Sequence, residues 1–228
     1  MKAQNAPATE SRITCTLAET PQDRDIVYRL RYHCYRRAQS IDPCANERFS
    51  DSYDALPNHF SFLAQAGSAN HLATVRISVV RPDLGWTSAP SQKVFGDHPA
   101  FERITRGSFV EASRLCFVDQ ARRDVLMQVV SYLAALADLY EVDSLVACPR
   151  AEQSPIYERL FGFVQLAEPR QYFGVKFATS LLGVSREQLH RHTRDTKSMD
   201  TARRNAFSRL LKQASPPSAA GIPRAPPP

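Results

Sequence analysis

The sequence lacks the long apolar run and the cysteine spacing by which several classes of protein are recognised. No stretch approaches the roughly 20 apolar residues that cross a bilayer, and residues 1–10 lack the apolar core of a signal peptide. We therefore expect a cytoplasmic protein. The five cysteines include no C-x-x-C pair and no spacing typical of metal ligands. These absences argue against disulfides and against any metal site.

The excess of positive over negative charge is confined to one end of the chain. The formal net charge of the 228 residues is +6. Residues 186–228 hold nine Lys or Arg against three Asp or Glu, which is the whole excess. A basic appendage on a neutral domain argues against a nucleic-acid partner for the domain.

The composition suggests one domain with an extension at each end. With 43% hydrophobic residues, the chain can bury a substantial core. We expect residues 1–12 to be disordered, 13–182 to form the domain, 183–213 to form a basic helical extension and 214–228 to be a disordered Pro-rich tail. Three roles remain open for the basic extension. It attracts an acidic partner, contacts a membrane peripherally, or serves only to keep the protein in solution.

Residues 107–118 combine the character of a buried strand with polar side chains. Both ends of this stretch are aromatic, aliphatic or β-branched, whereas Glu111, Ser113 and Arg114 stand in its middle. Alternation along a strand predicts that Glu111 and Ser113 share one face, with Arg114 and Cys116 on the other. Because a carboxylate is not buried unpaired, two interpretations remain open, a structural Glu–Arg network and a catalytic base with a hydrogen-bonding neighbour.

The expected elements alternate along the rest of the chain. They are a strand at 13–17, a helix beginning after Thr20, a long polar loop at 39–58, a hairpin at 59–65 and 71–80, a loop with one helical turn at 81–106, the strand at 107–118, a helix from Asp119 onward, a strand at 143–148, a helix at 154–163, and a hairpin at 164–166 and 172–181. This order predicts an α+β, or mixed α/β, fold with a central, mostly antiparallel, twisted sheet flanked by helices.

Charged residues outside the central stretch are candidates for the same site. Arg76 lies within a predicted strand, where an arginine needs a carboxylate partner. The loop at 39–58 supplies Asp51 and Asp54. We expect these aspartates to bind Arg76, or Arg31 of the first helix, and so to shape a binding site.

Part of the sequence resembles a large superfamily. Tyr157-x4-Gly162-Phe163, at the end of a strand-helix-strand-helix segment, resembles the second half of an N-acetyltransferase-type (GNAT) fold. The Gln/Arg-x-x-Gly-x-Gly/Ala loop with which coenzyme A users bind pyrophosphate is absent between Val118 and Val125. This difference favours the branch of the superfamily that takes long acyl chains from acyl carrier protein.

Four further elements resemble two bacterial families of that branch, the acyl-homoserine-lactone synthases and the N-acyl amino acid synthases of the FeeM type. The elements are Arg31-x3-Tyr35, Asp51-x2-Asp54, Arg76 and Glu111-x-Ser113-Arg114, and the resemblance spans about residues 20–182. The homoserine-lactone synthases carry a tryptophan six residues after the aromatic of the first helix, where this chain has Ile41. The N-acyl amino acid synthases are therefore the closer match.

The resemblance implies an acyltransferase that moves a long-chain acyl group from the thioester of acyl carrier protein to the amine of an amino acid or similar small acceptor. It implies no cofactor beyond an acyl-ACP or acyl-CoA co-substrate. The implied catalytic residues are Glu111, as the base, and its neighbours Ser113 and Arg114. The α-amine of an amino acid is largely protonated at neutral pH, so its attack on a thioester needs such a proton acceptor.

Other residues are expected to bind the two substrates. The substrate-binding residues are Arg31, Tyr35, Asp51, Asp54, Arg76, Phe117 and Val118. Main-chain amides near Phe117 and Val118 are expected to stabilise the tetrahedral oxyanion. Arg122 and Arg123, at the start of the next helix, are expected to dock the acidic surface of acyl carrier protein.

Three alternatives stay open at this point. The product is an acyl-homoserine lactone in the first, and the donor is an acyl-CoA in the second. In the third, the chain is a GNAT-shaped binding module without activity, and its charged residues form only a structural network. The sequence leaves open the acyl length, the acceptor and the oligomeric state.

Overall fold

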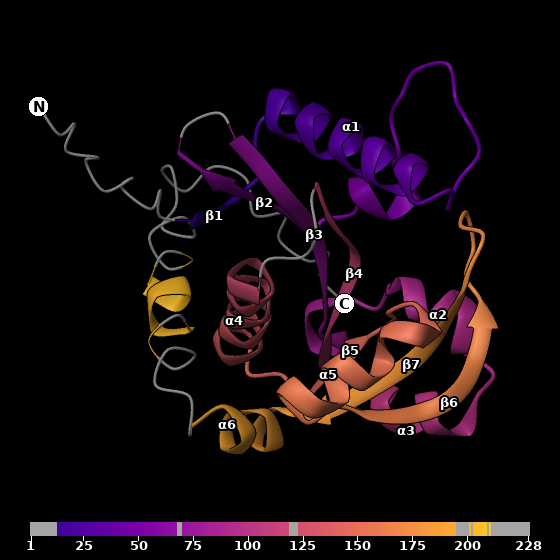
Figure 1. The fold of residues 1–228 in the computed structure, drawn as a ribbon. Helices are drawn as coiled ribbons and strands as arrows, with labels where there is room; N and C mark the ends of the chain where they lie inside the picture. The colour runs from indigo at the N-terminus through magenta and orange to yellow at the C-terminus, as the bar shows by residue number, and fades with distance from the viewer. Residues whose placement is uncertain are drawn as a thin grey trace, which may run out of the picture.

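The computed structural model describes residues 13–67, 70–118, 123–194, 201, 203–208 and 210. The expected disordered segments 1–12 and 214–228 lie outside these residues. Within them, seven strands form one sheet in the order β1-β2-β3-β4-β5-β7-β6 (Figure 1). The strands are β1 (Ile13–Leu17), β2 (His59–Ala66), β3 (Asn70–Val80), β4 (Phe109–Phe117), β5 (Ser144–Ala147), β6 (Val164–Gln171) and β7 (Ala178–Ser185).

The sheet is mostly antiparallel, as predicted. The one parallel pair in it joins β4 to β5, and the other neighbouring pairs of described strands are antiparallel. The helices are α1 (Pro21–Arg37), α2 (Pro90–Phe95), α3 (Pro99–Thr105), α4 (Arg123–Leu139), α5 (Ser154–Phe161) and α6 (Arg186–Arg194). Among the described residues, none of the helices combines the length and the apolar character that crossing a bilayer requires.

The two faces of the sheet differ in chemistry. Val75, Ile77 and Val79 of β3 belong to the main apolar core, which they form together with α4. Alternation then places Arg76 and Ser78 on the opposite face, where both are fully buried and where α1 packs against β2, β3 and β4. The polar side chains of the central strands therefore lie on the face that α1 covers in part, whereas the face under α4 is apolar.

The helix α1 begins where the sequence predicted. Thr20 caps it: its hydroxyl accepts a hydrogen bond from the Asp23 amide at 3.1 Å, while the Asp23 carboxylate accepts one from the Thr20 amide at 3.2 Å. Pro21 occupies the first helical position, where a missing N–H costs nothing. This reciprocal cap fixes the start of the helix that carries Arg31, Cys34 and Tyr35 into the site.

The segment 81–106 is more helical than predicted. We expected a loop with one helical turn, but the chain forms a 3-10 helix at Pro82–Leu84, followed by α2 and α3. Each of the three begins with a proline. Proline favours both loops and the first position of a helix, so a sequence rich in proline was read as a loop. The correction matters because α2 reaches the central strand.

The strands β4 and β5 run side by side for only a few residues. They pair from Phe109 and Ser144 as far as Ala112 and Ala147. Beyond Ala147 the chain no longer pairs with β4 but stays beside β7, where the Pro149 carbonyl accepts a hydrogen bond from the Ser180 amide at 3.1 Å, whereas β4 continues to Phe117. The described part of β4 after Ala112 therefore has no parallel partner strand, and a space opens there.

The C-terminal segment packs against the domain. The helix α6 follows β7 directly, and Ala206 and Leu210 are buried in the main core. On α4, Asp138 lies 3.2 Å from Nε2 of His190 and 3.6 Å from a terminal nitrogen of Arg203. The described part of the basic extension therefore covers α4.

Candidate active site

Glu111 is the carboxylate at the centre of the site. It lies in β4 opposite Ser78 of β3 and Val146 of β5, and it is fully buried. Its partner is Ser91, in the first turn of α2. The Ser91 amide donates to Oε1 and Oε2 of Glu111 at 3.2 and 3.0 Å, and the Ser91 hydroxyl donates to Oε2. The neighbour predicted for a catalytic base is thus a serine that the sequence analysis did not select.

The ionisation of Glu111 is poised near neutrality. Burial raises the pKa of its carboxyl from an ordinary value of 4.5 to about 7, against the lowering effect of the hydrogen bonds from Ser91. Within the described residues Glu111 forms no ion pair, which disfavours the interpretation of a structural Glu–Arg network. A carboxyl with a pKa near 7 is half ionised at neutral pH, as a general base should be.

The loop between α1 and β2 is folded around a single turn that presents two aspartates. Asp51 caps the 3-10 helix Ser52–Ala55 by accepting a hydrogen bond from the Tyr53 amide at 3.0 Å, and the Asp54 carboxylate accepts one from the Asp51 amide at 3.0 Å. The spacing Asp-x-x-Asp is therefore a capping box. Both carboxylates also accept hydrogen bonds from side chains of α1 or of the sheet.

Three arginines converge on these carboxylates, which confirms the contacts predicted for the loop. Arg76 of β3 donates to Asp51 from both terminal nitrogens, one of them at 3.2 Å. Arg114 of β4 donates to Asp51 at 2.8 Å. Asp54 accepts from Arg31 of α1 at 2.8 Å and lies 3.2 Å from Arg76. Two carboxylates facing three guanidiniums leave one positive charge in excess.

Hydroxyl groups complete the network. Arg76 donates from Nε to the Ser113 hydroxyl at 3.1 Å, and Arg31 donates to the Ser61 hydroxyl at 2.9 Å. Burial raises the pKa of Asp51, but the arginines hold it well below its ordinary value. Burial lowers the pKa of Arg76, but the hydrogen bonds that it donates to Asp51 and the two nearby carboxylates raise it above its ordinary value. The network therefore remains ionised across the neutral range.

Arg114 occupies an unusual backbone conformation. In the ladder between β3 and β4, Arg76 pairs with Ser113 but Thr74 pairs with Cys116. One extra residue is therefore accommodated in β4, which is a β-bulge, and Arg114 has a positive φ of 56°. A left-handed conformation is uncommon for an arginine inside a buried strand and typical of functional sites.

The bulge corrects our assignment of faces. Simple alternation placed Arg114 opposite Ser113, but the Arg114 guanidinium binds Asp51 on the same side. It also placed Cys116 opposite Glu111, whereas Cys116 hydrogen-bonds to Cys34 of α1, on the polar face. An inserted residue shifts the period of two by one, so every side chain after it changes face.

Aromatic rings enclose the Arg114 guanidinium. Its central carbon lies 4.4 Å from the ring centroid of Phe49 and 5.7 Å from those of Tyr172 and Phe173. Arg114 also donates a hydrogen bond to Tyr35. These contacts are cation–π interactions of a largely desolvated arginine. They hold Arg114 at the boundary between the charged network and the space beyond it.

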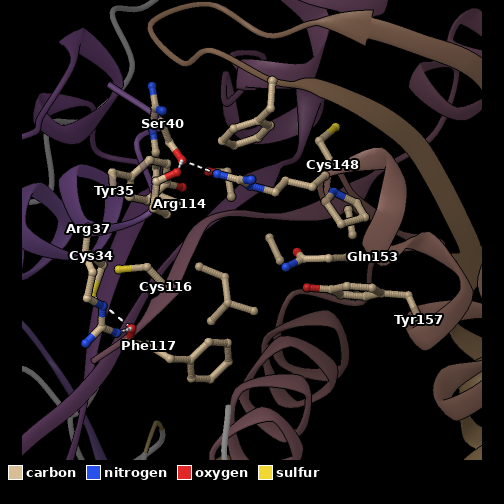
Figure 2. A pocket seen from close by; sticks show the side chains of 18 residues that line it. Cys34, Tyr35, Arg37, Ser40, Arg114, Cys116, Phe117, Cys148, Gln153 and Tyr157 are labelled. Carbon is tan, nitrogen blue, oxygen red and sulfur yellow. Dashed lines mark hydrogen bonds between the residues drawn. The ribbon is translucent and has the colours of Figure 1, made fainter. Parts of the chain in front are cut away.

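A cavity of about 470 Å³ fills the space between the diverging ends of β4 and β5 (Figure 2). Its wall consists of residues from α1 and the following loop (Cys34, Tyr35, Arg37, Ala38, Ser40), from β4 (112–117), from the end of β5 and the chain after it (Ala147, Cys148, Pro149, Arg150, Gln153), and Tyr157 and Phe177. The volume is typical of a pocket for a small ligand. The charged residues among these are all arginines.

Figure 2 shows Tyr157 and Gln153 on the side of the cavity opposite Cys34 and Cys116. Burial raises the pKa of Tyr157 to about 12, so its phenol stays protonated at neutral pH. The hydrogen bond with Cys34, together with burial, raises the pKa of the Cys116 thiol well above its ordinary value. A thiol held protonated is a poor nucleophile, whereas a protonated phenol is a hydrogen-bond donor.

The two residues expected near the oxyanion differ in their placement. Phe117 lines the cavity, and its carbonyl accepts hydrogen bonds from Cys34 and Arg37, both at 3.1 Å. The Val118 amide instead donates to the Leu72 carbonyl at 2.9 Å. That amide is committed to the sheet, so the donor role expected of Val118 does not fit this structure.

Several functional contacts escaped the sequence analysis, and one prediction lies outside the structure. Ser91 and Ser61 were missed because nothing local in the sequence connects a serine to a charged residue 20 or 30 positions away. Arg122, which we predicted to dock acyl carrier protein, is outside the described residues, and so is the side chain of Arg123. Their contact with acyl carrier protein stays a prediction.

Comparison with known proteins decides the family. The model of the family described as N-acyl amino acid synthase FeeM matches residues 26–185, which include every residue of the charged network and of the cavity wall. The chain belongs to the N-acyl amino acid synthase FeeM family. It is therefore an acyltransferase enzyme of the N-acyl type. No curated protein matches the sequence.

Solved structures similar to this FeeM family member share its fold at low sequence identity. FeeM itself, an N-acyl amino acid synthase from uncultured soil microbes, has a TM-score of 0.65 and 14% identity, over 79% of this chain and 94% of that one. The AHL synthase LasI has a TM-score of 0.58 and 14% identity, over 80% and 94%. The CoA-dependent acyl-homoserine lactone synthase BjaI has a TM-score of 0.52 and 20% identity, over 80% and 88%.

The fold class is thereby confirmed. N-acetyltransferases are also among the similar structures, so this mixed α+β fold is GNAT-like. The resemblance stated from Tyr157-x4-Gly162-Phe163 and from the charged residues of the sequence is confirmed as well, because the family model and the solved structures agree. The matched span contains the network around Asp51 and the cavity beside it.

Proposed function

We propose that this enzyme transfers a long-chain acyl group from the thioester of acyl carrier protein to the amine of an amino acid or a similar small acceptor. The observation that carries the proposal is the position of Glu111: a buried carboxyl with a pKa near 7, next to Ala112, where β4 begins to line the cavity. A proton acceptor thus lies beside a space suited to a thioester.

The cavity suits the donor. Its wall combines apolar side chains, which suit a long and thin acyl chain, with the unpaired edge of β4, to which the amides of an extended pantetheine arm can hydrogen-bond. No acidic side chain is among the residues that line it. An anionic group on the pantetheine arm would therefore meet only positive charge, from Arg37, Arg114 and Arg150.

The charged network suits the acceptor. Its excess positive charge favours a molecule that carries a carboxylate beside its amine, as an amino acid does. Glu111 is the group that then accepts a proton from the ammonium, directly or through a water molecule. Arg76 and Asp51 contribute to the field at Glu111, so the network and the base act on one substrate.

The residues present can account for each bond and each proton that changes place in the transfer. The amine nitrogen attacks the thioester carbonyl carbon, so a C–N bond forms and the C–S bond breaks. Glu111 takes one proton from the acceptor's ammonium group, and a second proton from nitrogen reaches the departing thiolate, which leaves as a thiol. Tyr157, protonated and in the cavity wall, can relay this second proton, by giving its own proton to the sulfur and taking up the one from nitrogen. The products are an amide and the free thiol of the carrier, and no covalent enzyme intermediate is needed.

A direct assay tests the proposal. The purified protein is incubated with acyl carrier proteins loaded with acyl chains of several lengths and with a mixture of amino acids, and amide products are identified by mass spectrometry. The same assay with acyl-CoA, or with S-adenosylmethionine as acceptor, examines the two enzymatic alternatives. We expect N-acyl amino acids from the carrier-bound donors, at the highest rate with a long chain.

Three outcomes would contradict the proposal in different ways. Faster turnover with acyl-CoA would overturn the assignment of acyl carrier protein as the donor. The similar synthase BjaI is CoA-dependent. An acyl-homoserine lactone as the product would overturn the acceptor. A folded protein that produces no acylated amine from any donor would favour a binding module.

A further inference from the structure

The hydroxyl and amide of Ser91 together hold the Glu111 carboxylate. The amide lies 3.2 Å from Oε1 and 3.0 Å from Oε2, and the hydroxyl binds Oε2. Ser91 is fully buried, as is Glu111. Within the described part of the chain, no other side chain or main-chain group hydrogen-bonds to this carboxylate. Its orientation therefore depends on one residue.

The position of Ser91 follows from the start of α2. Pro90, which has no N–H, occupies the first helical position, and the amide of the next residue has no carbonyl partner within the helix. The Ser91 amide is thus available to a carboxylate without loss of a helical hydrogen bond. Because Pro90 precedes it at the start of the helix, Ser91 can donate from both its amide and its hydroxyl to the Glu111 carboxylate.

Both flanks of this turn are fixed by the rest of the protein. Before it, the Asn58 side-chain amide donates to the carbonyls of Ser88 and Val79 at 2.9 and 3.0 Å. After it, Arg170 of β6 donates to the Val94 carbonyl at 3.0 Å and also binds Asp97. Ser91 is therefore held from two sides, in a frame that does not include the charged network.

We propose that Ser91 is a positioning residue of acyl transfer, which fixes the Glu111 carboxylate toward the acceptor and stabilises its ionised form. The proposal rests on the function proposed above. Ser91 itself would not touch the substrates. It would act through Glu111, by supplying in a buried place the hydrogen bonds that water supplies to an exposed carboxylate.

Other groups face Glu111 but do not replace Ser91. They are Arg76 from β3, Asp51 and Tyr53 from the loop after α1, Cys148 after β5, and Tyr172 after β6. Of these, only Arg76 favours the ionised carboxylate, and its nitrogens are bound to Asp51 and Ser113. Burial raises the pKa of Glu111 and the Ser91 hydrogen bonds lower it, so loss of the hydroxyl should raise it further.

The test compares the pH dependence of kcat/KM in four proteins. The wild type should lose activity below a midpoint near pH 7. In Ser91→Ala, which keeps the amide but not the hydroxyl, the midpoint should rise by about one pH unit, because a hydrogen bond to a charged group contributes about that much. Activity should largely recover at high pH. Ser91→Thr, which keeps the hydroxyl, should restore the midpoint, and the control Ser88→Ala should leave the whole profile unchanged.

Two results would overturn the proposal. One is an unchanged midpoint with activity lowered equally at every pH, which is the behaviour of a purely structural residue. The other is an unchanged profile in Ser91→Ala. If Ser91→Ala does not fold, Ser91→Cys takes its place, because the thiol fills the space but is a weak donor. The midpoint should then rise as well.

A second measurement separates this proposal from the proposed function. The protonation of Glu111 is followed by infrared spectroscopy of its carboxyl group, which is assigned by its disappearance in Glu111→Gln, and no turnover is required. A higher titration midpoint in Ser91→Ala than in the wild type supports the control of Glu111 by Ser91, even if no acyl transfer is found. Equal midpoints in the two proteins overturn it, even if acyl transfer is found.

Discussion

The Arg76 guanidinium binds the Asp51 carboxylate through both of its terminal nitrogens. Arg76 is fully buried in the sheet, whereas Asp51 comes from a loop and its side chain is 17% exposed. The same carboxylate also binds Arg114. A loop residue therefore supplies the counter-charge for two arginines of the central strands, and the loop is part of the site.

Substitution of Asp54 tests the importance of this loop for stability and activity. Asp54 binds Arg31, and the side chains of the pair are 4% and 0% exposed. Asp54→Asn should lower the free energy of unfolding by about 3–5 kcal/mol, because removal of one partner leaves a buried charge uncompensated. Acyl transfer should decrease too. Denaturant unfolding and steady-state kinetics measure the two effects.

A matched control lies in the same loop. Asp42 pairs with Lys176, but its side chain is 79% exposed, so Asp42→Asn should change stability little. Equal, small effects of the two substitutions would show that the Asp54 pair has no special role.

Removal of the base should abolish most activity without unfolding the protein. Glu111→Gln keeps the size of the side chain and one acceptor oxygen for Ser91, but it cannot take a proton. We expect acyl transfer to decrease by at least about a hundredfold, the contribution typical of a general base. Circular dichroism should show a folded protein. Near-normal turnover by the folded variant would make Glu111 a structural residue.

The same carboxyl should make stability depend on pH. The folded protein holds the Glu111 proton up to about pH 7, whereas an unfolded chain with the ordinary value of 4.5 releases it earlier. The group's contribution is thus fully present below pH 4.5 and is lost as the pH rises through 7. The difference in unfolding free energy between the wild type and Glu111→Gln should decrease over this range. A difference that stays constant with pH would argue against the raised pKa.

Charge reversal at the start of α4 tests the carrier-protein donor. Arg122→Glu/Arg123→Glu should raise the apparent KM for acyl carrier protein with little change in kcat, because the residues attract the acidic partner and take no part in the chemistry. The effect should weaken with salt, as the screening length falls below about 8 Å. A short acyl-pantetheine thioester should react equally well with both proteins. Arg106→Glu, on the exposed end of α3, is the control for a change of net charge.

Part of the site could be predicted because buried charge has strict requirements. An arginine inside a strand needs a carboxylate, so Arg76 pointed to the aspartates of the neighbouring loop, and the structure joins them. The start of α1 was predictable for a similar reason, since Thr20 and Asp23 satisfy each other over three residues. A single sequence therefore allows the prediction of features that are local, such as a helix cap, or strictly required, such as the partner of a buried charge.

Other features depend on contacts that a single sequence does not encode locally. The bulge at Arg114 arises from the register between β3 and β4, and no glycine marks it. The contact of Ser91 with Glu111 depends on where α2 crosses the sheet, and α2 itself was hidden in a proline-rich segment. Sequence alone therefore predicted the wrong face for some side chains, and did not reveal some hydrogen-bond partners, where contacts between distant elements override the local pattern.

The capping box of the 3-10 helix has a consequence for how the charged network assembles. Asp51 and Asp54 belong to one four-residue turn, so they cannot approach the sheet separately. When this turn docks, Arg31, Arg76 and Arg114 gain their counter-charges in a single event, and when it undocks they lose them together. The net charge of the network therefore changes by two units at once, from three positive charges without the turn to one with it.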